Sequence, residues 1–140
     1  MENIMATFTS DMVAGNQSFK PFPSGALGVR YAKINITAAV NSADVYKMVD
    51  VFAGETVHDV KIKSSDLDTG TGLVFGVGDG GDTDKYIAAS TCGQGGTADH
   101  SDADLAPVNY SVDDTIDIIC EVAPAGDVAT GTLEMWVYVS

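Results

Sequence analysis

Residues 131–139 read GTLEMWVYV, a stretch in which bulky apolar side chains recur at every second position. One face of this segment carries Leu133, Met135, Val137 and Val139, and the other carries Thr132, Glu134, Trp136 and Tyr138. Successive side chains of a β-strand point to opposite sides, so the alternation predicts a strand with one buried face. The four aliphatic side chains are therefore expected in the core.

The same alternation recurs upstream. Residues 115–122 read TIDIICEV, with an expected inner face of Ile116, Ile118, Cys120 and Val122. Residues 29–39 form another strand, with an expected inner face of Ala32, Ile34, Ile36 and Ala38. Turn residues separate further strands at 45–52, 57–63, 73–77, 85–89 and 107–110. No stretch has a helical period, and half-buried strands favour antiparallel pairing, so we predict an all-β fold, an eight-stranded antiparallel jelly-roll sandwich.

Residues 1–28 lack such a period. They are rich in Ser, Gly, Asn and Pro and contain three isolated aromatic residues, Phe8, Phe19 and Phe22. We expect an extended N-terminal arm at 1–28, packed on its own domain or on a neighbour, and one jelly-roll domain at 29–140. Residues 53–56 predict a tight hairpin turn in which Gly54 has a positive φ. Residues 90–105 form a long Gly-rich loop, of a length typical of functional or mobile loops.

The net charge of the chain argues against some classes of binding partner. The 140 residues include 20 Asp and Glu but only 7 Lys and Arg, a formal net charge of −13. Such a surface repels the phosphates of nucleic acids and anionic membranes, so we expect neither as a partner. The apolar runs are too short to span a bilayer, and the N-terminus does not resemble a secretory signal. Cys92 and Cys120 match no metal or disulfide pattern, and reduced thiols are typical of folding in a cytoplasm.

Asp residues cluster with Gly at 66–70 and 79–84, and a third acidic cluster lies at 99–104. Calcium takes six to eight oxygen ligands, which makes Asp79, Asp82 and Asp84 the candidates for a Ca²⁺ site. The segment lacks the Gly and Glu positions of an EF-hand loop, and Asp and Gly are also the usual residues of β-turns. Both interpretations stay open; no firm metal ligand is assigned, and no cofactor is expected.

No catalytic residue is predicted. A nucleophilic triad needs a positioned Ser or Cys, a His and an acid, and the sequence has no Gly-x-Ser-x-Gly turn. His58 is expected to share a strand face with Val60 and Ile62, and His100 lies in an acidic loop. The glycines at 76, 78, 80 and 81 follow a strand but open no helix, so they form no phosphate-binding loop. We therefore expect a protein that is not an enzyme.

Two large aromatic residues, Trp136 and Tyr138, lie opposite the core face of the last strand. Aromatic side chains are enriched at protein interfaces, so both are candidates for a subunit interface. The alternative is that the same chain covers both faces of this strand. With the aromatics of the arm, the interface candidates are Phe8, Phe19, Phe22, Trp136 and Tyr138.

Three stretches carry a resemblance to a known family: MVDVFAGETVHDV at 48–60, SDLDT at 65–69 and VGDGGDTDKYI at 77–87. DDTID at 113–117 and ATGTL at 129–133 fit the same pattern of turns and strands. Residues 45–139 resemble the decoration, or cement, proteins of tailed-bacteriophage heads. The resemblance implies a jelly-roll subunit that trimerises and binds the major capsid protein on the outside of an icosahedral shell. It also implies assembly in the host cytoplasm and no catalytic residues.

Two other functions fit the same fold. A carbohydrate-binding β-sandwich module uses exposed aromatics and often carries Ca²⁺, although the secreted form would need a signal peptide. A phage tail or fibre component is the other alternative, but such proteins tend to contain repeats or heptads, which we do not find in this sequence.

Overall fold

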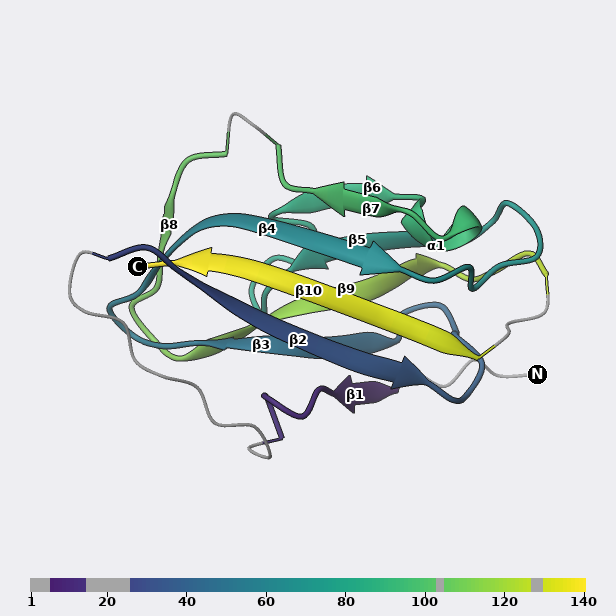
Figure 1. Ribbon diagram of the computed structural model, residues 1–140, viewed down its shortest axis with the longest axis horizontal. Coiled ribbons are helices and arrows are strands. Elements are labelled where there is room, and N and C mark those ends of the chain that lie inside the picture. Colours follow the sequence, from purple (N-terminus) through teal and green to yellow (C-terminus); the bar gives the residue numbers. More distant parts are fainter. Residues whose placement is uncertain (1–5, 15–25, 103–104, 127–129) are drawn as a thin grey trace.

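Two β-sheets pack face to face in the computed structural model, which describes residues 6–14, 26–102, 105–126 and 130–140 (Figure 1). Sheet B consists of β2 (Gly28–Ile36), β10 (Gly131–Val139), β4 (Thr56–Ser64) and β7 (Ala98–His100), with β8 (Val108–Asn109) also paired to β4. Sheet A consists of β1 (Thr7–Thr9), β3 (Val45–Val51), β9 (Asp114–Val122), β5 (Val74–Gly78) and β6 (Ile87–Ser90). A single helical turn, α1 (Cys92–Gly95), follows β6. No helix in the described part of the chain is long and apolar enough to cross a membrane.

The alternating strands supply the core between the sheets. All four aliphatic side chains of β10 predicted to face inward are completely buried. Leu133, Met135 and Val137 belong to the same core cluster as Phe75, Ile116 and Ile118 of sheet A, which are also completely buried. The predicted all-β sandwich is therefore confirmed. Between described strands the pairing is antiparallel except where β1 runs parallel to β3.

The described residues contain ten strands rather than eight. The eight predicted strands are present, and β1 and β7 are the additions. Both additions are three residues long, too short to display a period of two in the sequence. Residues 6–14 of the predicted arm belong to the sandwich, since β1 pairs with β3 and Met12 is buried in the core.

A β-bulge changes the predicted face of His58. Tyr138 pairs with Asp59 and the next residue, Val139, pairs with Val57, so His58 is the extra residue of β4. A bulge shifts the alternation by one position. Val57 and Val60 therefore both face the core while His58 is exposed, contrary to the prediction that His58 shares a face with Val60.

A tight turn forms at residues 53–56 with Gly54 at φ 91°, as predicted, but it joins β3 of sheet A to β4 of sheet B, so the predicted hairpin between paired strands is wrong. Next to it lies a buried cation that the sequence did not single out. Arg30 of β2 faces inward, and its guanidinium forms an ion pair with Glu55 and donates a hydrogen bond to the carbonyl oxygen of Asp50 at 3.0 Å. Arg30 has the same parity along β2 as the core residue Ala32, and a buried guanidinium is stable only with such partners.

The loop between β4 and β5 is organised by the buried carboxylate of Asp68. Five backbone N–H groups donate to it, those of Gly70, Gly72, Leu73, Ala125 and Gly126, over 2.8–3.2 Å. Burial opposes its ionisation, but these hydrogen bonds outweigh that effect and hold the pKa of Asp68 well below its usual range. One side chain thus ties this loop to the loop that precedes β10.

The hairpin loop after β5 lies against the outer side of that strand. A Cβ atom added at Gly78 would lie 2.8 Å from the Cα atom of Thr83 and closer still to the carbonyl oxygen of Asp82. Only glycine leaves room for such a close backbone approach. The glycine pattern of this segment therefore serves packing of the hairpin, consistent with its rejection as a phosphate-binding loop.

Candidate interaction surface

The outer side of sheet B carries three rows of side chains across β2, β10 and β4. The pairing register aligns Lys33, Glu134 and Lys63 in the first row, Tyr31, Trp136 and Lys61 in the second, and Val29, Tyr138 and Asp59 in the third. We call these nine residues the sheet B outer face. Figure 1 shows β10 between β2 and β4 at the front of the molecule.

Trp136 lies at the centre of this face. Its ring centroid is 5.1 Å from that of Tyr31, and the Lys61 ammonium lies 5.2 Å from the Trp136 ring centroid. Such aromatic and cation–π contacts hold the side chains in place without removing them from solvent. Burial, and secondarily the charge of Glu134, raises the pKa of Tyr31. The prediction that Trp136 and Tyr138 point away from the core is confirmed, and both remain partly exposed.

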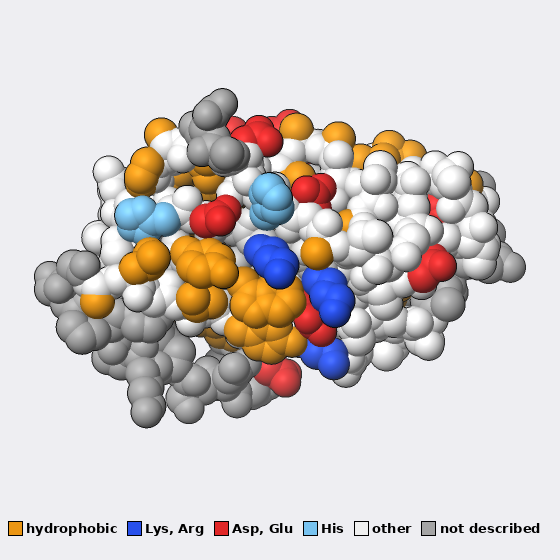
Figure 2. All heavy atoms as spheres, turned by 45° about the horizontal axis from the view of Figure 1, so that its top comes forward, with side chains coloured by type: hydrophobic (Ala, Val, Ile, Leu, Met, Phe, Trp, Pro, Cys, Tyr) orange, Lys and Arg blue, Asp and Glu red, His pale blue; other side chains and the backbone are white. Residues whose placement is uncertain are grey.

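Exposed apolar side chains are concentrated on and next to the sheet B outer face. Leu27, Val29 and Tyr31 are three of the five exposed large hydrophobic residues in the described part of the chain; the others are Val112 and Val122. Figure 2 shows hydrophobic side chains gathered on this side of the molecule, with lysines beside them. A cluster of this kind is typical of a surface that binds another protein.

The same face holds much of the available positive charge. Lys33, Lys61 and Lys63 are exposed there, whereas Arg30 is buried and the Lys85 ammonium is 2.7 Å from the carboxylate of Asp79. Three of the chain's seven Lys and Arg thus lie on one face of a protein with a net charge of −13.

The outer side of sheet A is acidic by contrast. A shallow pocket there is lined by Lys47, Asp50, Asp113, Asp114 and Thr115. Burial raises the pKa of Asp50, Arg30 lowers it, and Asp113 raises it further. The outer sides of the two sheets therefore differ in charge.

Replacing Asp117 by asparagine is expected to stabilise the protein at neutral pH. Asp117 lies on this acidic side, and burial, with a smaller contribution from Asp114 and Asp79, raises its pKa from 3.8 to about 6 despite the opposing effects of Thr115 and Lys47. A carboxyl whose pKa is raised in the folded state destabilises that state when ionised, so wild-type stability should increase as the pH falls from above 6 towards 4. An asparagine still accepts the 2.6 Å hydrogen bond from Thr115 Oγ1. We expect a gain of about 1 kcal/mol at pH 7 and a flatter pH profile.

Urea unfolding of wild type and Asp117→Asn at several pH values checks this prediction. The control is Asp102→Asn, which removes one negative charge from an exposed position and should leave stability at pH 7 within about 0.5 kcal/mol of wild type. A loss of stability at pH 7 in Asp117→Asn would contradict the prediction.

The arm aromatics are placed differently from Trp136 and Tyr138. The Phe8 ring stacks on Tyr46 with centroids 4.9 Å apart and an interplanar angle of 14°, a contact within the same chain. Phe19 and Phe22 lie outside the described residues. Tyr31 and the three lysines were not among the interface residues predicted from the sequence, because their association with Trp136 depends on strand pairing.

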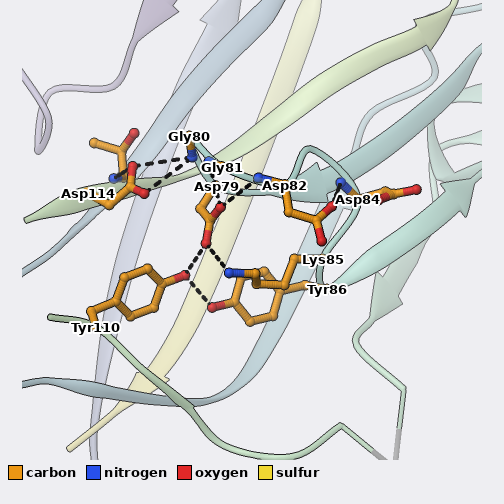
Figure 3. A network of polar contacts seen from close by, with 10 residues as sticks. Asp79, Gly80, Gly81, Asp82, Asp84, Lys85, Tyr86, Tyr110 and Asp114 are labelled. Carbon is orange, nitrogen blue, oxygen red and sulfur yellow. Dashed lines mark hydrogen bonds and ion pairs between the residues drawn. The ribbon is translucent and has the colours of Figure 1, made fainter. Parts of the chain in front are cut away.

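The calcium candidates occupy the loop between β5 and β6 (Figure 3). One carboxylate oxygen of Asp79 accepts hydrogen bonds from Lys85 Nζ at 2.7 Å and Tyr110 OH at 2.8 Å. The other accepts from the N–H groups of Gly81 and Asp82 at 2.9 and 3.0 Å. Burial opposes ionisation of Asp79, but the contacts with Lys85 and Tyr110 outweigh it and lower its pKa.

The other two candidates are exposed. The backbone N–H of Asp84 donates to the Asp82 carboxylate at 3.3 Å, and the proximity of Asp82 raises the pKa of Asp84. In the described part of the chain, no group of three or more His, Cys, Asp or Glu side chains is placed to hold a metal ion. These contacts are typical of a turn, in which the Asp79 carboxylate already accepts hydrogen bonds from Lys85, Tyr110 and the N–H groups of Gly81 and Asp82.

A second pocket, at the edge of sheet B, contains both histidines together with Asp59, Ser101, Asp102 and Leu105. The Ser101 hydroxyl donates to the carboxylate of Asp59 rather than to a histidine. The Nδ1 atom of His100 lies 2.9 Å from the carbonyl oxygen of Ser101, and His58 contacts Ser140. This is not the arrangement of a nucleophile activated by a base.

No protein-family model and no curated protein matches the sequence. Solved structures do match the fold. A chain from the capsid of Ralstonia phage GP4 has a TM-score of 0.81 at 19% identity, over 95% of this chain and 96% of that chain. A chain from the capsid asymmetric unit of cyanophage Pam1 has a TM-score of 0.68 at 23% identity, over 88% and 93% of the two chains. A chain from the acidic stable capsid of Helicobacter pylori bacteriophage KHP30 has a TM-score of 0.53 at 14% identity, over 79% and 86%.

Proposed function

We propose that this chain is a structural protein of a bacteriophage head, a cement protein that binds the outside of the shell and stabilises contacts between major capsid proteins. The observation that carries the proposal is the fold shared over nearly the whole chain with a protein of the phage GP4 capsid. The match covers 95% of this chain and 96% of that chain, so the GP4 capsid chain is of similar length to this one rather than much larger. A small accessory subunit fits that relation.

The charge supports a place on the exterior of the particle. A protein with a net charge of −13 is repelled by packaged nucleic acid and remains soluble on an outer surface. The partly exposed aromatic residues of the sheet B outer face supply the side-chain types that carry binding energy in protein interfaces. The proposal includes a homotrimer assembled in the host cytoplasm, and it requires neither a cofactor nor a catalytic residue.

The test uses phage particles made without this chain. We expect such particles to release their genome at a lower temperature than complete particles, and purified protein added back should bind the heads and restore the release temperature. Failure to bind, or a lower release temperature after addition, would contradict the proposal. Light scattering should give a mass three times 14.5 kDa for the free protein, with or without a chelator; a mass that falls on chelation would instead implicate Ca²⁺ in assembly.

Carbohydrate binding is the alternative with a structural observation in its favour, because Trp136 and Tyr31 form an aromatic surface on a sheet. Lys61, however, lies over the Trp136 ring, so a sugar ring stacking there would have to displace the lysine. Titration calorimetry with oligosaccharides distinguishes the two functions. Saturable heat that disappears in Trp136→Ala would favour the sugar-binding function.

A further inference from the structure

We infer that the sheet B outer face is the surface that docks on the shell, and that its binding site there is an apolar patch bordered by carboxylates. This inference rests on the proposed function and adds the orientation of the subunit and the chemistry of its partner.

The distribution of side-chain types identifies the face. The second row places Trp136 between Tyr31 and Lys61, and the first row places Glu134 between two exposed lysines. Trp and Tyr at the centre of a patch with charged residues around them is the usual composition of an interface core and its rim. A partner that complements this face therefore has an apolar centre and a border of negative charge.

The opposite side of the sandwich is unsuited to the same partner. The outer side of sheet A is lined by Asp50, Asp113 and Asp114, with Lys47 as its one basic residue in that pocket. Because the two sheets pack face to face around the core, a subunit that docks through the outer side of sheet B directs the outer side of sheet A away from the shell. The acidic surface then faces solvent, where ionised carboxylates are most stable.

A second copy of the chain fits this face less well. Its complementary acidic surface lies on the opposite side of the sandwich, and front-to-back stacking of that kind extends into an open filament. Face-to-face contact around a two-fold axis closes as a dimer. Neither arrangement is a ring of three, so a homotrimer built through other surfaces of the chain leaves this face available for the shell.

The experiment measures binding of purified protein to heads that lack it, by co-sedimentation at several protein and salt concentrations. Trp136→Ala should bind roughly thirty-fold more weakly, the effect of losing one central aromatic side chain. Lys33→Gln with Lys63→Gln should bind roughly five-fold more weakly at low salt and show a shallower salt dependence. Val112→Ala, an exposed apolar position in the loop between β8 and β9, and Lys47→Gln, on the acidic side, are the matched controls and should bind like wild type.

Binding of the wild-type protein distinguishes failure of the proposed function from failure of the inference about the docking face. If wild type does not bind the heads, the proposed function fails and the inference fails with it. If wild type binds, the inference is overturned when the sheet B variants bind equally well, or when Lys47→Gln alone weakens binding. A variant that binds weakly because it has lost the trimer mass also overturns it, since the face would then be a contact between copies. Circular dichroism and light scattering on each variant establish its fold and mass, and the two exposed lysines keep the test valid if Trp136→Ala does not fold.

Discussion

Replacing Asp68 by alanine is expected to lower the midpoint of thermal unfolding by roughly 10 °C, because five backbone N–H groups lose the one buried carboxylate that accepts from all of them. The donors belong to two loops, one after β4 and one before β10, so the substitution also removes the contact between these loops. Asp68→Asn should be nearly as damaging. Its amide nitrogen would face N–H groups that need an acceptor, such as those of Gly72 and Leu73.

The control for Asp68 is Asp66→Ala, an exposed position in the same loop that accepts one hydrogen bond at 3.3 Å. This variant should unfold within a few degrees of wild type. The pH dependence adds an independent test. The folded-state pKa of Asp68 is depressed, so the stabilisation is complete above the unfolded-state pKa near 4 and is lost as the pH falls further. The difference between wild type and Asp68→Ala should therefore narrow below about pH 4; an unchanged midpoint at pH 7 would contradict the assigned role.

Gly78→Ala is expected to lower the free energy of unfolding by about 3 kcal/mol. The added methyl group would overlap the backbone of Asp82 and Thr83 in the hairpin loop. Backbone atoms move only with the whole loop, and that loop is tied to β5 and to Lys85 and Tyr110 through Asp79. Urea denaturation followed by tryptophan fluorescence measures the change.

Two other glycine variants provide comparisons for the loss of stability in Gly78→Ala. At Gly76 the added methyl would first meet the flexible carboxylate of Glu121, so Gly76→Ala should cost only about 1 kcal/mol, and Glu121→Ala should recover part of it. Gly95→Ala adds a methyl group to open space and should leave stability within about 0.5 kcal/mol of wild type. Equal effects at all three positions would show that loss of backbone freedom, rather than overlap, is responsible.

Several features of the fold follow from the sequence alone. The period of two along β10 determines which side chains are buried and which point outward, because it depends only on the local geometry of an extended chain. The same argument, together with the turn residues between strands, gives the all-β class, eight of the ten described strands and the outward direction of Trp136. It fails at His58, where a bulge inserts one residue, and at Val122, which was predicted to face inward but is exposed where the register of β9 with β5 shifts. It also fails at β1 and β7, which are too short to show a period.

The interaction surface could be predicted only in part, because its residues come from three strands that are distant in the sequence. Trp136 was identifiable from its own strand, but Tyr31 and Lys61 lie about 105 and 75 positions earlier and join it through the register of β10 with β2 and β4. Arg30 and Asp68 likewise contact residues that are distant in the sequence. Arg30 was not predicted as a buried residue, and its partner Glu55 lies 25 positions away in the sequence; the Gly126 N–H that binds Asp68 lies 58 positions away. Local alternation by itself determined the strands and their faces; the tertiary structure decided which faces and charges meet, because pairing register and loop contacts are set by packing between distant segments.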